Sequence, residues 1–273
     1  MDITGNAFVT GGGSGIGKAT TIALAKEGAS GVLIADLNLK AAQETVAEAT
    51  AAATNPKFRA EAIEVDVSKE DSVKNAVAHM VKSFGRIDYC VHSAGIPVRV
   101  PALISDDNFP EVRAHLDINV YGTYLVLGQI TAAMKVQEPK PIDPNLPQIG
   151  STRGTIVSLG SAASLLAQPG LVQYVGAKHA VLGIVKTAAI EGAPIGIRVN
   201  CICPSWVDTP MLAQCKEAIP QFNEDTITYG IPMNRIGAAK EIADVALFLV
   251  SPRSSFVTGA IVPVDGGMSI SVK

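Results

Sequence analysis

Charge is the first thing that this chain of 273 residues has little of. Charged residues make up 17% of the sequence, whereas about 25% is usual in soluble proteins. The net charge is −3. A general nucleic-acid binder needs a basic patch or stripe, so we expect no nucleic-acid partner. The hydrophobic content of 48% also excludes a disordered protein.

Long apolar runs and a targeting segment are missing as well. No apolar stretch reaches the roughly 18 residues that a membrane helix needs. The first residues, MDITGNAFVTGGG, contain neither the basic region nor the apolar region of a signal peptide. We therefore expect a cytoplasmic protein without a membrane partner.

Cysteine is sparse, and its spacing fits neither a zinc site nor a redox pair. We interpret Cys90, Cys201, Cys203 and Cys215 as reduced packing residues of a cytosolic protein. Cys201 and Cys203 fall in one expected strand, and we expect them on opposite faces of it. Histidines and carboxylates also lack the spacing of metal ligands, so we expect no metal.

What the chain does contain is a regular alternation of short apolar runs and segments with helical periodicity. We expect strands at Asn6–Thr10, Gly31–Asp36, Ala62–Asp66, Ile87–His92, Thr155–Leu159, Ile197–Ile202 and Ile261–Val264. We expect helices at Ile16–Gly28, Leu39–Ala53, Lys69–Phe84, Val112–Met134, Val172–Glu191 and Ala239–Val250. Continuously apolar strands are typical of parallel sheets, and strict alternation indicates a doubly wound sheet. The sequence predicts one α/β domain over residues 1–273.

Two segments interrupt the alternation. Residues 136–153 contain four prolines and predict a surface insert. Residues 205–237 form a long mixed stretch where a substrate lid would lie. Its apolar side chains either pack a short helix on the core or line a hydrophobic pocket: Trp206, Met211, Leu212, Phe222, Tyr229, Ile231 and Met233.

A glycine-rich turn follows the first expected strand and opens the first expected helix. Glycines permit a tight turn and close backbone approach to a pyrophosphate, and a helix N-terminus adds partial positive charge. This context predicts a dinucleotide site. Its residues are Thr10, Gly11, Gly13, Ser14, Gly15, Ile16 and Gly17.

The end of the second expected strand carries Asp36, 19 residues after Gly17. A carboxylate there accepts hydrogen bonds from ribose hydroxyls and repels a 2′-phosphate. Neither Ser14 nor Leu37 provides a cation for that phosphate. We therefore expect NAD(H) rather than NADP(H), with Asp36 and Leu37 beside the adenosine. The alternative is a plain glycine-rich turn followed by a helix-capping aspartate.

The third expected strand ends in Asp66 and Val67. This acid could meet the adenine amino group, or it could cap the helix that begins near Lys69. The sequence leaves both alternatives open.

Tyr174 and Lys178 stand four residues apart in an expected helix, and so on one face of it. A nearby ammonium favours the phenolate and lowers the pKa of the tyrosine toward a range suited to proton transfer.

With these motifs in order, the chain resembles the short-chain dehydrogenase/reductase family over nearly its whole length. The motifs that carry the resemblance are the turn Thr10–Gly17, Asn119, Ser161 at 13 residues before Tyr174, Lys178, the stretch with Asn200, Pro204 and Thr209, and Asp265-Gly266-Gly267.

The resemblance implies the catalytic set Asn119, Ser161, Tyr174 and Lys178. Tyr174 would exchange the proton with the substrate oxygen, and Ser161 would hold that oxygen. Lys178 would lower the pKa of Tyr174 and hold the nicotinamide ribose, while Asn119 would kink its helix and hold a water linked to Lys178. Further cofactor contacts are implied for Ser93, Ala94, Gly95, Pro204, Val207 and Thr209.

The family also implies seven parallel strands in the order 3-2-1-4-5-6-7 and a homotetramer or homodimer built on the two longest helices. The expected reaction is hydride transfer between NAD(H) and a moderately large apolar secondary alcohol or ketone. The proline-rich insert resembles those of fungal members, which suggests secondary metabolism. Other chemistry on this scaffold (epimerisation, dehydration or cyclisation) and a non-catalytic NAD(H) sensor are the alternatives.

Three positions depart from the family pattern. Ser93 stands in place of an asparagine, Gly160 precedes Ser161 where a serine is usual, and Ser205 replaces a glycine after Pro204. We expect Gly160 to alter the pocket floor and Ser205 to shift the backbone beside the nicotinamide.

Overall fold

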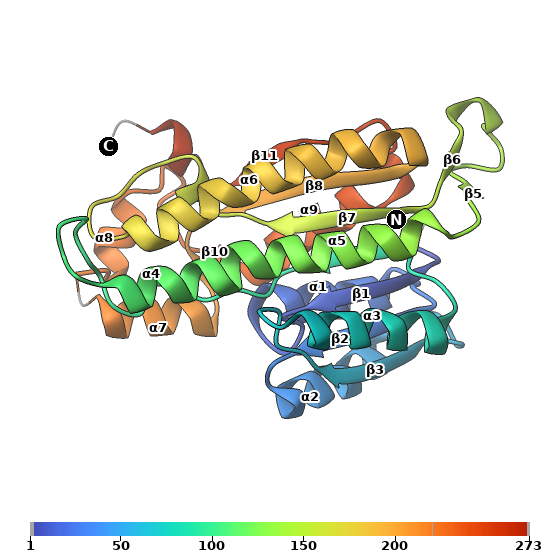
Figure 1. The fold of residues 1–273 in the computed structure, drawn as a ribbon, viewed down its shortest axis with the longest axis horizontal. Coiled ribbons are helices and arrows are strands. Elements are labelled where there is room, and N and C mark those ends of the chain that lie inside the picture. Colours follow the sequence, from blue (N-terminus) through green and yellow to red (C-terminus); the bar gives the residue numbers. More distant parts are fainter. Residues whose placement is uncertain (1–2, 220, 272–273) are drawn as a thin grey trace.

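A seven-stranded parallel sheet forms the centre of the computed structural model, which describes residues 3–219 and 221–271 (Figure 1). Its strands are β1 (Asn6–Thr10), β2 (Gly31–Asp36), β3 (Arg59–Glu64), β4 (Tyr89–His92), β7 (Gly154–Leu159), β8 (Ile197–Pro204) and β11 (Ile261–Val264). They lie in the order β3-β2-β1-β4-β7-β8-β11, and every neighbouring pair is parallel. The predicted doubly wound sheet and its strand order are confirmed. Residues 1–2, 220 and 272–273, which belong to the predicted domain and, for 220, to the predicted lid, lie outside the described residues.

Helices cover both faces of the sheet, because side chains alternate in direction along each strand. On β1, Phe8 packs into the core on one face, while Ala7 and Val9 pack into the core on the other. The first core involves α3 (Glu70–Phe84), α5 (Gly122–Lys135) and α6 (Val172–Gly192); the second involves α1 (Gly15–Lys26), α2 (Leu39–Ala52) and α9 (Ala239–Val250). In Figure 1, α5 and α6 run side by side across the front of the sheet. Within the described ranges, no helix combines the length and apolarity that crossing a bilayer requires.

Two predicted elements differ from the structure by more than two residues at one end. β3 runs over Arg59–Glu64 rather than Ala62–Asp66, because it pairs with the whole of β2 from Gly31 onward. It is an edge strand with half-exposed side chains, so it lacks the apolar run that marks a central strand.

The helix predicted over Val112–Met134 is divided into three parts. α4 (Phe109–His115) is followed by a π-helical turn, Leu116–Tyr121, and then by α5. A single wider turn changes the spacing of apolar residues too little to be detected in the sequence. The sequence pattern therefore missed the boundaries of the π-helical turn. π-helical turns occur often at functional sites, and this one contains Asn119.

The proline-rich segment 136–153 forms a small antiparallel hairpin of β5 (Lys140–Pro141) and β6 (Ser151–Thr152). It lies at the right of Figure 1, whereas α7 (Pro210–Ala218) and α8 (Glu224–Tyr229) of the predicted lid lie at the left. The insert and the lid therefore occupy opposite ends of the sheet.

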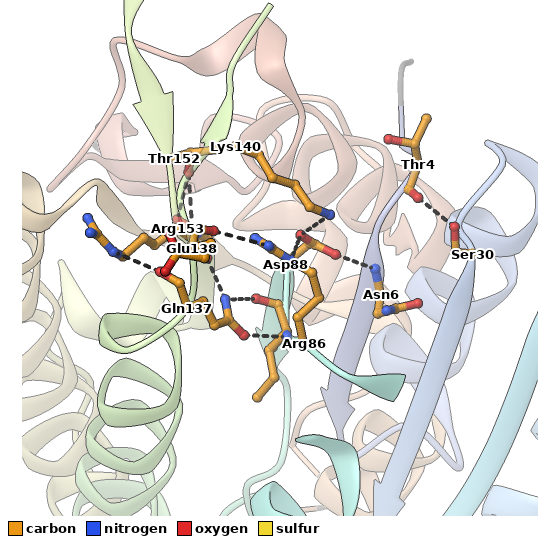
Figure 2. A network of polar contacts seen from close by, with 12 residues as sticks. Thr4, Asn6, Ser30, Arg86, Asp88, Gln137, Glu138, Lys140, Thr152 and Arg153 are labelled. Atoms are coloured by element: carbon orange, nitrogen blue, oxygen red, sulfur yellow. Dashed lines mark hydrogen bonds and ion pairs between the residues drawn. The ribbon is translucent and has the colours of Figure 1, made fainter. Parts of the chain in front are cut away.

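A polar network ties the insert to the amino end of β4 (Figure 2). The Gln137 side chain donates to the carbonyl oxygens of Ile87 and Arg153 and accepts the Ile87 amide at 2.7 Å. The nearly buried Asp88 carboxylate forms ion pairs with Arg86 at 2.6 Å and Lys140 at 3.1 Å. The Gln137 bonds satisfy backbone groups of Ile87 and Arg153, and the Lys140 ion pair adds a side-chain link, so together they hold the base of the hairpin in one place.

The four cysteines are buried free thiols, as predicted. The expectation that Cys201 and Cys203 point to opposite faces of β8 is wrong, because residues two apart in a strand share a face. Both sulfurs lie over Gly160: a Cβ atom at that glycine would stand 2.9 Å from Cys201 Sγ and 2.8 Å from Cys203 Sγ.

Candidate active site

A cavity of about 360 Å³ opens at the carboxyl ends of the parallel strands. The predicted residues that line it are Gly11, Ser14, Gly15, Ile16, Asp36, Leu37, Asp66, Val67, Ser93, Ala94, Gly95, Ser161, Tyr174, Lys178, Pro204, Val207 and Thr209. Four other predicted residues, Thr10, Gly13, Gly17 and Asn119, lie behind this lining and contact the residues that form it.

The glycine turn brings backbone close to the cavity. Gly11 has a φ of +63° and Gly15 a φ of +50°, conformations that side-chain-bearing residues rarely adopt. A Cβ at Gly11 would lie 2.8 Å from the Ala94 amide nitrogen. α1 begins at Gly15, so its first amides and its positive dipole end face the cavity. This open cradle fits a pyrophosphate.

Asp36 stands at the end of β2 with both carboxylate oxygens engaged. Oδ2 accepts the Gly13 amide at 2.8 Å, and Oδ1 accepts the Asn38 amide at 2.9 Å. These bonds fix the carboxylate in the cavity wall. Among the described lining residues, Lys178 is the only cation, so nothing in this wall offsets the negative charge of Asp36.

Asp66 does not cap α3, because the N-cap residue of that helix is Lys69 and no side chain caps it. Its Oδ1 accepts the amide of Ser68 at 2.9 Å and the hydroxyl of Ser68 at 2.6 Å, in the turn before α3. The residue also lines the cavity, beside Val67. The alternative of a helix cap is therefore wrong, and the position of Asp66 in the lining leaves an adenine contact as a prediction.

Three predicted catalytic side chains meet in the cavity. Tyr174 and Lys178 lie on α6, and Lys178 Nζ stands 5.7 Å from the centre of the Tyr174 ring. Tyr174 hydrogen-bonds to the side chain of Ser161, which follows β7. The Lys178 ammonium donates to the Leu159 carbonyl oxygen at 2.9 Å.

Burial shifts the pKa values of Tyr174 and Lys178. It raises the pKa of Tyr174 to about 12, and the hydrogen bond with Ser161 acts in the opposite direction. Burial also lowers the pKa of Lys178. The expected lowering of the Tyr174 pKa below its ordinary value is thus not seen in this structure, in which the ammonium bonds to Leu159.

Asn119 uses its side chain to hold the loop after β4. Its Oδ1 accepts the Ile96 amide at 2.9 Å, and its Nδ2 donates to the Ile96 carbonyl at 3.1 Å. The backbone carbonyl of Asn119 accepts the Thr123 hydroxyl at 2.7 Å. A Cβ at Gly95 would meet both Asn119 Oδ1 and Lys178 Nζ within 4 Å, so the two predicted catalytic residues border the same glycine.

The three departures from the family pattern have local explanations. Ser205 donates its hydroxyl to the Asp265 carbonyl at 3.0 Å. Among the described non-glycine residues only Asn234 has a positive φ, so the backbone at Ser205 needs no glycine. Gly160 leaves room for the two sulfurs of β8. Ser93 lines the cavity, where its hydroxyl is available to a ligand.

The segment predicted as a lid contributes an apolar wall. β9 (Val207–Asp208) and β10 (Gly237–Ala238) pair at its base, and the rings of Trp206 and Phe222 meet edge to face at 5.0 Å. The lid residues Trp206, Met211, Leu212 and Phe222 line the cavity. Leu212, Trp206 and Phe222 also pack in a small core of the segment, so both alternatives from the sequence describe part of it. Tyr229 and Met233 are exposed instead.

Sequence reasoning missed several lining residues: Ile118, Gln168, Leu171, Cys215, Ile219 and Met268. It also did not place His115 at the site and allowed a surface or helix-packing position, of which packing is the one found. His115 is fully buried, and its ring meets the Tyr174 ring edge to face at 6.1 Å. Its position four residues before Asn119, on the same helical face, was the available signal. Among the described residues, no three histidine, cysteine or carboxylate side chains gather as metal ligands would.

Comparisons with known proteins agree with this geometry. Residues 11–269 match the family model described as Enoyl-(Acyl carrier protein) reductase. The short-chain dehydrogenase fogB of Aspergillus ruber is 49% identical over 271 residues, 99% of each chain. A 2,5-dichloro-2,5-cyclohexadiene-1,4-diol dehydrogenase of Sphingobium indicum is 36% identical over 269 residues, 98% of each chain.

A solved structure gives the same result. The 3-ketoacyl-(acyl-carrier-protein) reductase from Brucella melitensis complexed with NADH superposes with a TM-score of 0.82 at 30% identity, over 98% of this chain and 100% of that one. A nicotinamide cofactor therefore fits the glycine cradle of this fold. The chain belongs to the short-chain dehydrogenase/reductase family of oxidoreductases.

Proposed function

We propose that this protein transfers a hydride between NAD(H) and a secondary alcohol or ketone on a moderately large, apolar substrate. The observation that carries the proposal is the meeting of Tyr174, Ser161 and Lys178 in a cavity that continues to the glycine cradle. The named diol dehydrogenase among the relatives supports an alcohol as substrate.

The cofactor, when bound, supplies or accepts the hydride. The amides of the glycine turn and the start of α1 would hold its pyrophosphate, and the Asp36 carboxylate would accept its ribose hydroxyls. A 2′-phosphate would meet that carboxylate, and the only cation among the described lining residues is Lys178, which we assign to the substrate end. This is our argument for NAD(H) over NADP(H).

At the other end of the cavity, this chain's own residues handle the substrate oxygen and its proton. Ser161 holds the oxygen by a hydrogen bond. Tyr174 donates its phenolic proton to a carbonyl oxygen, or takes the proton from an alcohol in the reverse direction. The Lys178 ammonium, one helical turn away, stabilises the phenolate while the proton is absent. Asn119 holds the loop that forms the wall beside Lys178.

The wall around the substrate position is apolar and nearly free of charge. The lid supplies Trp206 and Phe222, and the loop after β4 supplies Val98. The thiol of Cys215 stays neutral there, since burial raises its pKa to about 11. A neutral substrate is therefore favoured over a carboxylate or a phosphate, which would lose its hydration without gaining a partner.

We also propose residues 205–237 as a substrate lid and 136–153 as a peripheral insert of a single domain. Leu116 and Tyr121 of the π-helical turn and Tyr124 of α5 are exposed apolar side chains. They support contacts between subunits of a homodimer or homotetramer. A cytoplasmic location and a role in secondary metabolism remain predictions.

The test is NADH absorbance with a panel of apolar secondary alcohols, using NAD⁺ and NADP⁺ in parallel. The proposal expects reduction of NAD⁺ by the native enzyme and none by Tyr174→Phe. If the native enzyme binds NADH but turns over none of the alcohols or the corresponding ketones, the sensor or another reaction on this scaffold replaces the proposal.

A further inference from the structure

A chain of buried hydrogen bonds connects the glycine turn to the π-helical turn. The Ala94 amide donates to Thr10 Oγ1 at 3.2 Å, and Thr10 Oγ1 lies 2.8 Å from His92 Nδ1. On the other side of the ring, His92 Nε2 lies 3.1 Å from Thr123 Oγ1, and Thr123 donates to the Asn119 carbonyl at 2.7 Å. The Thr10, His92 and Thr123 side chains are at most 2% exposed.

The number of protons fixes the direction of every bond in this chain. A threonine hydroxyl has one proton, and that of Thr123 goes to Asn119, so Thr123 Oγ1 must accept from His92 Nε2–H. A neutral ring protonated at Nε2 has a bare Nδ1, which accepts the proton of Thr10. Thr10 Oγ1 in turn accepts the Ala94 amide.

A neutral imidazole agrees with the surroundings of the ring. Burial, and to a smaller extent the charge of Lys178, lower the pKa of His92 to about 3. At neutral pH each donor and each acceptor along the chain is therefore used once, and a single arrangement satisfies all of them. Such a fully satisfied buried network holds its members rigidly.

We propose that His92 is a positioning residue that locks the Asn119 backbone carbonyl to the glycine turn through Thr10 and Thr123. The two ends of this chain belong to different halves of the site: Ala94 lines the cofactor side, and Asn119 holds the loop beside Lys178. His92 thereby fixes the proton-transfer groups relative to the cofactor. This role rests on the function proposed above.

The test compares a variant that breaks the hydrogen-bond chain at nearly constant side-chain volume with a variant that keeps it. Thr123→Val removes the hydroxyl, and Thr123→Ser keeps it. We expect Thr123→Val to lower kcat about tenfold while the Kd for NADH changes less than twofold, and Thr123→Ser to stay within threefold of the native kcat. His179→Gln is the control, because His179 is exposed on α6 and is not part of this chain.

Two results would overturn the proposal. One is a native kcat in Thr123→Val. The other is an equal loss of kcat and NADH affinity in both threonine variants, which a purely structural role would produce.

A second measurement does not depend on turnover. The ¹⁵N signals of His92 at pH 7, assigned by comparison with His92→Asn, should show a neutral ring with the proton on Nε2. A proton on Nδ1 would refute the proposed hydrogen-bond chain even in an active enzyme. If the native enzyme turns over no alcohol or ketone but His92 carries its proton on Nε2, the proposed function is refuted and the proposed hydrogen-bond chain is supported.

Discussion

The Gly13 amide donates to Asp36 Oδ2 over 2.8 Å, so the glycine turn orients the acid that we expect to read the cofactor ribose. Gly13 does not line the cavity itself, so its expected effect on the cofactor passes through Asp36.

Asp36→Ala should weaken the binding of NAD(H) and reduce the preference for NAD(H) over NADP(H). The change removes the acceptor of two ribose hydrogen bonds and the charge that repels a 2′-phosphate. Hydrogen bonds to a charged group contribute about 1.5–3 kcal/mol each. We therefore expect the Kd for NADPH divided by the Kd for NADH to fall at least tenfold. Fluorescence titration with NADH and NADPH measures this, with Glu44→Ala on exposed α2 as the control. An unchanged ratio would refute the role of Asp36.

Tyr174→Phe should abolish turnover and leave NADH binding within about twofold. Only the phenolic oxygen is lost, and general acid–base groups contribute about 10²–10⁴-fold to rate. Steady-state kinetics and NADH titration of the same samples separate the two effects. Tyr124→Phe is the control, since Tyr124 is 62% exposed on α5. Residual activity above about a tenth of native would remove Tyr174 from proton transfer.

The raised pKa of Tyr174 predicts opposite pH dependence for the two directions. With a pKa of about 12, the phenol keeps its proton throughout the physiological range. Ketone reduction needs the protonated phenol, so its kcat/KM should not change between pH 6 and 8 on account of Tyr174. Alcohol oxidation needs the phenolate, so its kcat/KM should rise about tenfold per pH unit from pH 7 to 9. A plateau for oxidation below pH 8 would mean that Lys178 lowers the Tyr174 pKa after all.

His92 should make the fold sensitive to acid. Its pKa is about 3 in the folded protein and 6.5 ordinarily, so between these values the unfolded chain binds a proton that the folded chain does not. The stability that His92 provides is complete above pH 6.5 and decreases as the pH falls toward 3. From pH 6.5 to 5 the free energy of unfolding should drop by about 2 kcal/mol on its account.

Urea unfolding of the native protein and of His92→Asn at pH 7 and pH 5 measures this contribution. The variant should lose less stability between the two pH values than the native protein. Equal losses would show that His92 does not titrate on unfolding.

Gly160→Ala should destabilise the protein, because its Cβ would lie within 2.9 Å of both β8 sulfurs. Overpacking a core costs about 1–3 kcal/mol. Cys203→Ala in the same chain should relieve part of that cost, with a favourable coupling above about 0.5 kcal/mol in a double-mutant cycle. Thermal unfolding of the four proteins provides the values. Additive effects would mean that the sulfurs leave room for the methyl group.

The central strands and the placement of Tyr174 beside Lys178 could be predicted because each depends on local pattern. β1 and β2 are continuous apolar runs, and Tyr174 and Lys178 share a helical face whatever surrounds them. The edge strand β3 could not be placed as well, since its residues are half exposed and its bounds follow the pairing with β2.

Other features depend on contacts between distant segments. The hydrogen bonds of Asn119, in the π-helical turn, to Ile96 join segments 23 residues apart. His92 and Thr123 are 31 residues apart, and neither position predicts the other. The rise in the Tyr174 pKa follows from burial, which the spacing of Tyr174 and Lys178 does not reveal.

The pairing of β9 with β10, secured by the Gly237 amide on the Trp206 carbonyl at 2.9 Å, brings the two ends of the lid segment together. A loop whose ends already meet can change in length or composition without displacing the strands on either side of it. The segment is thus suited to exchange as a unit between members of the family, with Tyr174, Ser161 and Lys178 left in place. New substrate selectivity could then arise by replacing one contiguous stretch of sequence.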